Sequence, residues 1–179
     1  MMDISKNKNE LFLRTVHYLK SGIVRLETDK GIFSLCDSLS DGDEYICENS
    51  VARFRISVFD KGGETVYKTV EVTCKTDLTL YSVSFVMDEV PTLQELVFYK
   101  SFINAPAAGF LRCGKEGFYT GVENPFFSVV RNDGRIVISY EPSLLLKAGE
   151  SYESDAHFMV HIFLAESRWH TESLSILKP

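Results

Sequence analysis

Gly117-Phe118-Tyr119-Thr120-Gly121-Val122-Glu123-Asn124-Pro125-Phe126-Phe127 opens the stretch that decides the fold, which runs on to Leu164. Aromatic and β-branched residues from Phe126 to Val130 favour a strand. Asn132-Asp133-Gly134 then supplies residues that tolerate the positive φ of a tight turn. We therefore predict a strand followed by a hairpin turn.

The next segment alternates with the period of two that a strand requires. Ile136, Ile138 and Tyr140 form one face of this predicted strand, and Pro142 ends it because proline lacks a ladder donor. Lys147-Ala148-Gly149-Glu150 predicts a further turn, and residues 156–164 a further strand. The hairpins make antiparallel pairing the expectation.

The remainder of the chain shows the same pattern of short strands and turns. Strands are expected at 11–19, 23–26, 32–35, 54–58, 66–74 and 78–86. Within the last of these, Tyr81, Val83 and Phe85 are expected to share one face. The segment 93–103 mixes helical and strand signals, and we interpret it as a short turn followed by a strand. The segments 37–50 and 104–109 are interpreted as loops.

The spacing of these signals indicates the fold class. Turns recur about every 8–14 residues, and no long amphipathic helix separates the strands, which is typical of an all-β antiparallel sandwich. We expect one domain over 11–179, after a polar lead-in over 1–10. Little helix is expected anywhere in the chain.

Composition restricts the partners and the compartment. The 179 residues carry a formal net charge of -6 and no cluster of Lys and Arg, which argues against nucleic acid and anionic membranes. The lead-in lacks the apolar core of a signal peptide, so a cytoplasmic location is expected. No C-x-x-C pair occurs among Cys36, Cys47, Cys74 and Cys113. We expect four reduced thiols, and a disulfide is the alternative.

Catalytic and metal chemistry find little support in the residue pattern. His157 and His161 lie on one face of a predicted strand, but four residues of strand span ~13 Å, too far to share one metal ion. We expect packed or hydrogen-bonded histidines, with no metal and no cofactor. The spacing of the nearby carboxylates shows no converging pair of the kind that a glycosidase needs. These carboxylates are Glu123, Glu150, Glu153 and Asp155.

The aromatic residues leave two interpretations open. Most aromatic side chains of a sandwich belong to its core, but some can form a platform on which a sugar stacks. The candidates for such a platform are Tyr119, Phe126, Phe127, Tyr140 and Tyr152. Trp169, beside His170, is either a carbohydrate contact or an anchor at an interface, and we favour the interface.

Three motifs carry a resemblance to a known family. Gly-Phe-Tyr-Thr-Gly-Val-Glu-Asn-Pro at 117–125, Tyr-Glu-Pro at 140–142 and Leu-Lys-Ala-Gly-Glu-Ser-Tyr-Glu-Ser at 146–154 resemble the N-terminal β-sandwich domains of α-galactosidase-like (melibiase-type) glycoside hydrolases. Such domains are similar in fold to galactose-mutarotase-like supersandwiches. The resemblance covers about a third of the chain and implies a carbohydrate-related role. In those enzymes the catalytic aspartates lie in a following (β/α)8 barrel, against which the sandwich packs.

Three functions follow from this resemblance. The first is a non-catalytic accessory domain that flanks a catalytic barrel, so that this chain alone hydrolyses no α-galactoside. The second is a free-standing carbohydrate-binding module, and the third is a small sandwich enzyme such as a sugar epimerase. The candidate carbohydrate or interface contacts are Tyr119, Glu123, Asn124, Trp169 and His170.

Two further expectations concern single features. Val122 is expected to point inward, while the Glu123 carboxylate either accepts backbone N–H bonds from its own loop or reaches a ligand, and we favour the first role. Gly117 and Gly121 are spaced like the bends of a short strand or wide turn. Leu174, Ile176 and Leu177 carry apolar surface, which suggests docking against a following domain or another subunit in a homo-oligomer.

Overall fold

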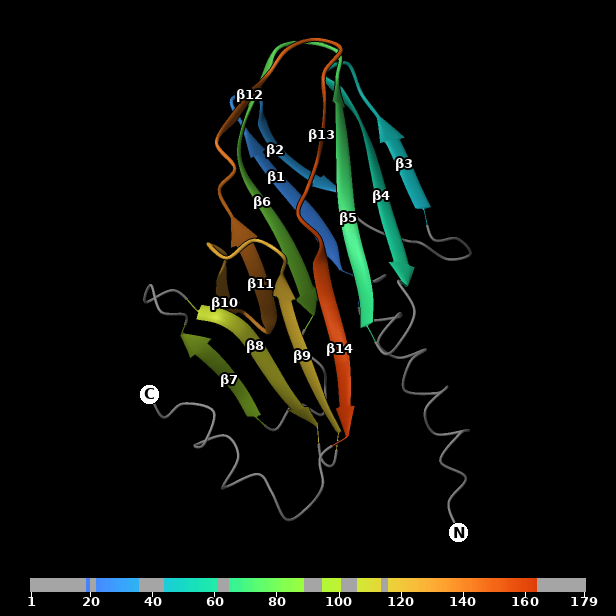
Figure 1. Ribbon diagram of the computed structural model, residues 1–179. Coiled ribbons are helices and arrows are strands. Elements are labelled where there is room, and N and C mark those ends of the chain that lie inside the picture. Colours follow the sequence, from blue (N-terminus) through green and yellow to red (C-terminus); the bar gives the residue numbers. More distant parts are fainter. Residues whose placement is uncertain are drawn as a thin grey trace.

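The fold was obtained as a computed structural model, which describes residues 19, 22–35, 44–60, 65–88, 95–100, 106–113 and 116–163. The elements in this part of the chain are all strands (Figure 1). They are β1 Ile23–Thr28, β2 Gly31–Leu35, β3 Glu44–Glu48, β4 Ala52–Asp60, β5 Thr65–Cys74, β6 Leu78–Asp88, β7 Glu95–Lys100, β8 Pro106–Cys113, β9 Glu116–Val122, β10 Ser128–Asn132, β11 Arg135–Tyr140, β12 Leu144–Leu146, β13 Ser151–Glu153 and β14 His157–Phe163.

The strands form two antiparallel sheets. The six-stranded sheet has the order β10-β11-β6-β1-β2, with β12 paired to β6 beyond the end of β11. The eight-stranded sheet has the order β3-β4-β5-β14-β9-β8-β7, and β13 pairs with β5 beside β14. The chain is therefore an all-β antiparallel sandwich, as its turn spacing predicted.

The core lies between the sheets and follows the period-two pattern. On β4, Phe54, Ile56 and Val58 are buried, while Arg53 and Arg55 face solvent. Buried side chains from β1, β6 and β11 complete the core from the other sheet, because alternate residues of a strand point to one face. They include Val24, Leu26, Val83, Phe85, Ile136, Ile138 and Tyr140.

The predicted turns are present. Asp133 and Gly134 both have positive φ, 48° and 72°, which gives the two-residue hairpin between β10 and β11 the conformation that matches strand twist. At the turn before β13, Gly149 has φ 89°, and the Lys147 N–H donates to Glu150 Oε2 at 2.7 Å. Pro142 follows the end of β11 at Tyr140. The sequence signals at these turns are thus confirmed.

Two segments predicted as loops contain strands. Residues 44–48 of the predicted loop 37–50 form β3, which pairs with β4 at the edge of the eight-stranded sheet. The segment was predicted as a loop because its sequence is acidic. An edge strand with one solvent-exposed face needs few apolar residues, so this composition is compatible with a strand. Likewise, Pro106–Gly109 of the predicted loop 104–109 belong to β8, where Gly109 pairs with Thr120.

The prediction that Tyr81, Val83 and Phe85 share one face is wrong. Glu27 of β1 pairs with Ser82, and the next residue, Thr28, pairs with Leu80, so Tyr81 is an extra residue in β6. Such a β-bulge shifts the alternation by one position. Val83 is fully buried as a result, whereas Tyr81 is 46% exposed.

Three smaller predictions also need correction. Phe126 and Phe127 precede β10, which starts at Ser128. Gly117 and Gly121 are not bends, because both lie inside β9 and pair with β14. Leu19, predicted at the end of a strand, has a helical backbone. The rest of that predicted strand (11–18), Trp169, His170 and the apolar residues 174–177 lie outside the described residues.

Candidate functional site

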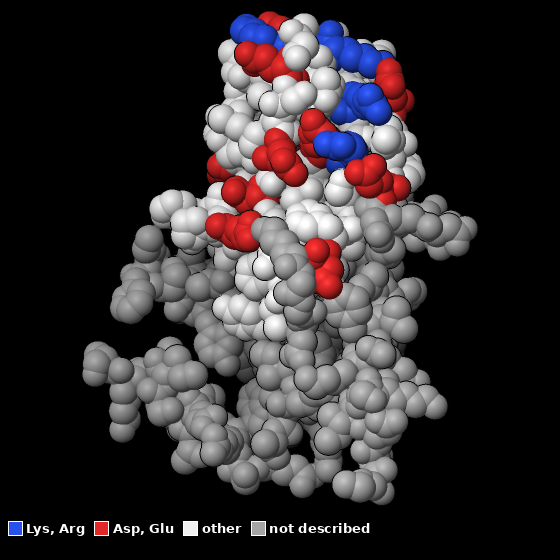
Figure 2. Space-filling view, turned by 45° about the vertical axis from the view of Figure 1, so that its right-hand side comes forward, with Lys and Arg blue, Asp and Glu red and all other residues white. Residues whose placement is uncertain are grey.

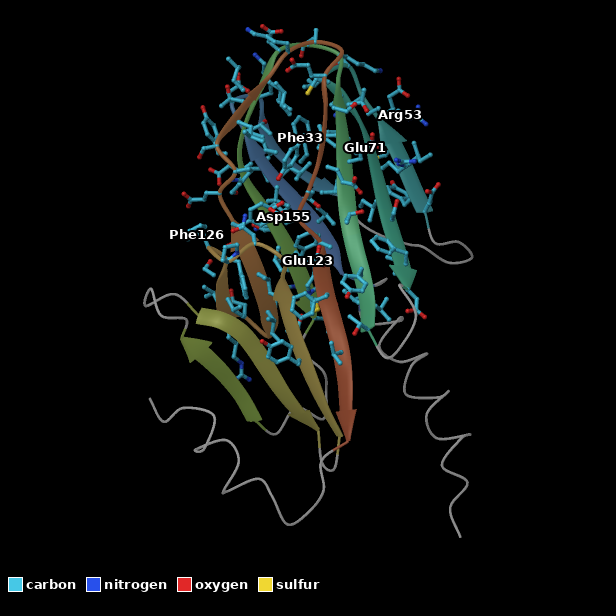
Figure 3. All side chains as sticks on the ribbon, viewed as in Figure 1. Phe33, Arg53, Glu71, Glu123, Phe126 and Asp155 are labelled. Carbon is cyan, nitrogen blue, oxygen red and sulfur yellow. The ribbon has the colours of Figure 1, made fainter. Side chains whose placement is uncertain are left out.

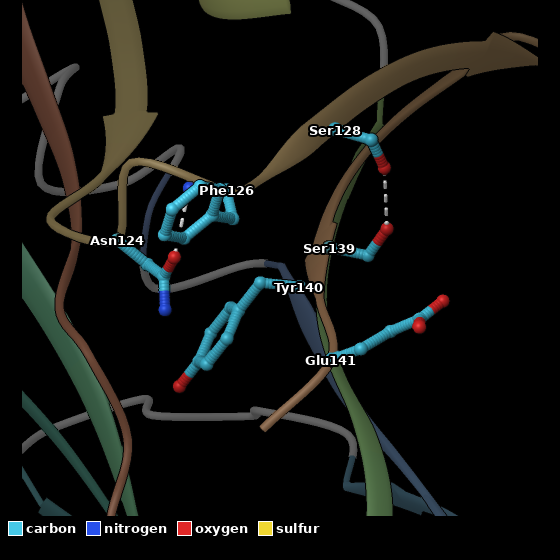
Figure 4. Close-up of a pocket in the computed structure, with 6 residues that line it drawn as sticks. All are labelled: Asn124, Phe126, Ser128, Ser139, Tyr140 and Glu141. Atoms are coloured by element: carbon cyan, nitrogen blue, oxygen red, sulfur yellow. Dashed lines mark hydrogen bonds between the residues drawn. The ribbon is translucent and has the colours of Figure 1, made fainter. Parts of the chain in front are cut away.

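A pocket of about 450 Å³ lies where the chain crosses from β9 in one sheet to β10 in the other. Figure 4 shows its lining, which comes from the crossing segment and from β10, β11 and the residue after β11. The lining residues are Asn124, Phe126, Ser128, Ser139, Tyr140 and Glu141. Below, this feature is called the Phe126 pocket.

Phe126 is the most exposed large apolar side chain in the described part of the chain, at 69%. Its position is held by Asn124, whose Oδ1 accepts the Phe126 N–H at 2.9 Å. The other end of the same amide donates from Nδ2 to Asp155 Oδ2 at 3.0 Å. Pro125, between them, restricts the backbone of Asn124. An exposed ring is thus presented by a constrained turn.

Beneath this turn, Tyr140 continues the hydrogen-bonded network. Its hydroxyl accepts the Asp155 N–H at 2.8 Å and lies 3.0 Å from the Tyr152 hydroxyl. Burial, followed by the hydrogen bond to Tyr152, raises the pKa of Tyr140 far above its ordinary value, so this hydroxyl stays neutral. Asp155 therefore ties the crossing segment to the strand that forms the pocket wall. Figure 3 labels Asp155 together with Glu123 and Phe126 of the crossing segment.

The polar wall of the pocket consists of two hydroxyls and one carboxylate. Ser128 and Ser139 face each other across β10 and β11, with their Oγ atoms 2.9 Å apart. Glu141 is exposed and is the first residue after β11, with its carboxylate pointing away from Phe126 in Figure 4. Serine hydroxyls both donate and accept, and a carboxylate accepts, so this wall can hydrogen-bond a polyhydroxylated ligand.

The described lining of the pocket holds one carboxyl group. Among the described residues that line it, Glu141 is the one carboxylate, whereas glycoside hydrolysis uses two carboxyl groups across the scissile bond. Across the described residues, no group of three or more His, Cys, Asp or Glu side chains could hold a metal ion.

The predicted contacts are separated by the fold. Asn124 lines the pocket, and the adjacent Glu123 is exposed, with its backbone N–H donating to Ala156 O at 2.9 Å. Val122 is buried, as predicted. Which role the Glu123 carboxylate has stays a prediction. Trp169 and His170 lie outside the described residues, so their roles also stay predictions.

Tyr119 belongs to a different feature, a row of aromatic rings on the outer face of the eight-stranded sheet. Its ring centroid lies 5.9 Å from that of Phe158, which lies 6.5 Å from Tyr67, and Tyr67 stacks on Phe59 at 5.6 Å. These rings cross four neighbouring strands, and all four residues are half-buried. The rings pack against one another, and Tyr119 is not among the described residues that line the Phe126 pocket.

Lys68, which the sequence did not single out, forms a buried polar pair with His157. Lys68 and His157 are paired across β5 and β14, and each is 1% exposed. Lys68 Nζ donates to the carbonyls of Leu19 at 3.0 Å and Gly22 at 2.7 Å, which compensates the burial of its charge. A lysine between Tyr67 and Thr69 carries no local signal that its acceptors come from about fifty residues earlier in the chain.

The surroundings of His157 define its tautomer. Thr120 donates its hydroxyl proton to Phe158 O at 3.1 Å, so the 2.8 Å contact between Thr120 Oγ1 and His157 Nε2 is a bond donated by the imidazole. His157 Nδ1 is then an unprotonated nitrogen, buried and without a hydrogen-bond partner in the described structure. The expectation of a packed, hydrogen-bonded histidine is confirmed at 157. The side chain of His161 is not described.

A second hollow, of about 250 Å³, lies on the outer face of the eight-stranded sheet and is lined by Arg53, Arg55, Glu71 and Thr73. Figure 2 shows acidic and basic side chains alternating near this end of the molecule. The Arg55 guanidinium bonds Glu71 at 2.5 Å and approaches Glu44 at 3.9 Å. Because these charges compensate one another, the hollow is a weaker candidate than the Phe126 pocket.

Two cysteine side chains lie within the described residues. Cys47 is half-buried and Cys74 is buried, and burial raises the pKa of the Cys74 thiol, which lowers its reactivity. Cys36 and the side chain of Cys113 are not described. In the described residues, no helix has both the length and the apolarity needed to cross a membrane.

Fold and site together define an antiparallel sandwich with a polar pocket and one exposed aromatic ring at a crossing between its sheets. No family model and no curated protein matches the chain. Among solved structures, it is similar to the "Putative kojibiose phosphorylase from human microbiome", with 13% identity and a TM-score of 0.48. That match covers 78% of this chain and 21% of the other, so the chain spans about a fifth of that protein. The resemblance to α-galactosidase-like enzymes gains no direct match here.

Proposed function

We propose that this chain is a non-catalytic carbohydrate-binding sandwich domain, with the glycan bound at the Phe126 pocket. The observation that carries the proposal is a pocket of about 450 Å³ whose described lining includes a 69% exposed phenylalanine, two serine hydroxyls and a carboxylate that points away from that ring. Small-molecule sites combine aromatic surface with a few placed polar groups in this way.

The chemistry of a sugar matches these groups. The ring of Phe126 offers an apolar face to the C–H face of a pyranose, while Ser128 and Ser139 supply partners for its hydroxyls. Glu141, which points away from the ring, can accept from a hydroxyl further along the ligand. Since the Asn124 bonds already hold the backbone of Phe126, little ordering of the loop is needed on binding. A preorganised pocket of this kind supports recognition without any catalytic group.

We also propose a domain arrangement for this sandwich. A binding domain without a carboxylate pair acts as an accessory to a catalytic domain, and the family resemblance of residues 117–154 motivates a barrel of the α-galactosidase-like type as that partner. We keep the free-standing binding module as the alternative arrangement. Both arrangements use the same pocket, and both leave this chain inactive toward glycosides on its own.

The experiment is affinity electrophoresis of the full chain against a panel of soluble α- and β-glucans, galactans, mannans and xylans, followed by calorimetry with whichever is bound. Phe126→Ala should weaken binding by roughly tenfold or more, because 1.4 kcal/mol of lost contact energy corresponds to a factor of ten. Its melting temperature should stay close to that of the wild type, since the ring is largely exposed.

Ile46→Ala is the matched control. Ile46 is 48% exposed on β3 of the other sheet, so this variant removes exposed apolar surface away from the pocket. Unchanged binding by the control and weakened binding by Phe126→Ala would support the proposal. Retention of no polysaccharide by the folded wild type, or equal binding by both variants, would refute it.

A further inference from the structure

Tyr81 is a second exposed aromatic residue, and it belongs to the six-stranded sheet that contributes the hydroxyl wall of the Phe126 pocket. Regular alternation would place this ring in the core together with Val83. The bulge in β6 instead leaves it 46% exposed, at the cost of one disrupted ladder position. Bulges often re-aim a side chain beside a functional site, so the exposure of Tyr81 calls for an explanation.

The strand register places Tyr81 beside the pocket. Tyr140 of β11 pairs with Val83, and Leu144 of β12 pairs with Leu80, so residues 141–143 run alongside Ser82 and Tyr81. Glu141, a lining residue of the pocket, therefore lies between Ser139 and the stretch that Tyr81 occupies. Residues 141–143 thus lie opposite only two residues of β6, and the positive φ of Ser143, 50°, lies within this longer segment.

The surface between the pocket and Tyr81 is polar. Ser139 pairs with Ser84, which is buried, whereas Glu141 is exposed and Ser82 is half-buried. The Ser82 hydroxyl, two residues from Ser84 along β6, donates to Glu27 Oε2 at 3.3 Å. On the far side, Leu145, which is 60% exposed and pairs with Thr79, extends the apolar surface near Tyr81.

We infer that the binding surface extends from the Phe126 pocket across Glu141 to Tyr81, and that its ligand is an extended, linear glycan chain rather than a single terminal sugar. This inference rests on the proposed function. Ser139 of the pocket pairs with Ser84, and the three residue steps along β6 from Ser84 to Tyr81 span about 10 Å at ~3.3 Å per residue. Such a span exceeds one pyranose ring and suits consecutive sugars that meet an aromatic ring at each end.

The two rings are expected to determine different properties: Phe126 the affinity for every ligand, and Tyr81 the preference for longer ligands. Phe126 contacts the sugar in the pocket, and every ligand that binds needs it. Tyr81 meets a sugar further along the chain, and only longer ligands reach it. Oligosaccharides that span both rings should therefore bind more tightly than a disaccharide of the same linkage, and removal of the Tyr81 ring should abolish that difference.

The test uses isothermal titration calorimetry of the full chain with the disaccharide and the hexasaccharide of the polysaccharide that affinity electrophoresis retains. The wild type should bind the hexasaccharide at least roughly tenfold more tightly, equivalent to 1.4 kcal/mol. Tyr81→Ala should reduce hexasaccharide affinity to the level of the disaccharide and leave disaccharide affinity unchanged. Tyr81→Phe, which keeps the ring, should retain the preference for length.

The outcomes separate this inference from the proposed function. If Phe126→Ala abolishes binding of both ligands and Tyr81→Ala changes neither, the pocket binds glycan but the extension to Tyr81 is wrong. Equal affinity of the wild type for both lengths would refute the extension as well. If no polysaccharide in the panel is retained, the proposed function fails and the extension fails with it. Thermal melts of each variant check that the loss is not one of folding.

Discussion

Acidification should destabilise this protein through His157, and the size of the effect follows from where the ring is buried. The imidazole lies between Lys68, Thr120 and Phe85, whose ring centroid is 5.0 Å away. Burial, and after it the positive charge of Lys68, lower the pKa of His157 from 6.5 to about 3. Protonation in the folded state would place a second cation in the core beside Lys68.

The sign follows from proton binding. Between pH 6.5 and about 3 the unfolded chain holds a proton on His157 and the folded chain does not, so lowering the pH favours unfolding. At pH 5 the loss relative to pH 7.5 is about 2 kcal/mol, since the unfolded residue is then 1.5 units below its pKa. For a domain of this size, that corresponds to a fall of about 4–8 °C in Tm.

The assay is chemical denaturation at pH 7.5 and pH 5 for the wild type and for His157→Gln. Glutamine can donate to Thr120 Oγ1 as Nε2 does, but it has no proton to take up. Any constant difference in stability between variant and wild type cancels when the change between the two pH values is compared. The pH dependence that comes from the carboxylates Asp29, Glu48 and Asp77 cancels as well, because interactions with neighbouring groups lower their pKa values in both proteins.

The difference in unfolding free energy between wild type and variant should therefore change by about 2 kcal/mol over this pH interval. Parallel pH dependence of the two proteins would refute the reasoning, because it would mean that His157 is protonated equally in the folded and unfolded chains. A histidine ring that water reaches would behave in that way.

Other substitutions test the remaining packing and the site. Gly121→Ala should destabilise the fold by ~1–3 kcal/mol, because the new methyl would lie 3.1 Å from the Phe158 ring, and a thermal melt measures it. Lys68→Met should cost ~1–3 kcal/mol in denaturant unfolding, since two buried carbonyls lose their donor; an unchanged midpoint would contradict this. Asn124→Ala keeps Phe126 in the sequence but removes both side-chain bonds that anchor its turn, so it should weaken glycan binding measured by calorimetry. Glu123→Gln should lower Tm without altering glycan binding, and the reverse pattern would assign the carboxylate to a ligand.

Local sequence determined the fold class and most of the turns. Alternation over 54–58 and 136–140, and the residues Asp133, Gly134 and Gly149 at positive φ, act through neighbours along the chain, so their outcome can be read from the chain. The candidate site was accessible only in part. Asn124 could be singled out from its motif, and Phe126 could be named among the aromatics, but no pattern distinguished its exposed ring from the buried Phe127.

Tertiary structure decided the features that depend on partners distant in the chain. The strand β3 exists because β4 offers it an edge, and Tyr81 faces outward because β1 and β6 differ by one residue in register. Asp155 joins Asn124 to Tyr140 only once both sheets are in place. The polarity of Lys68 would assign it to the surface, whereas carbonyls from elsewhere in the chain allow its burial. A packed or hydrogen-bonded His157 was predicted, but its partner Thr120 comes from β9 and was not. Hydrogen bonds and register between remote segments leave no periodic trace in a single sequence, which is why the pocket emerged only with the packed sandwich.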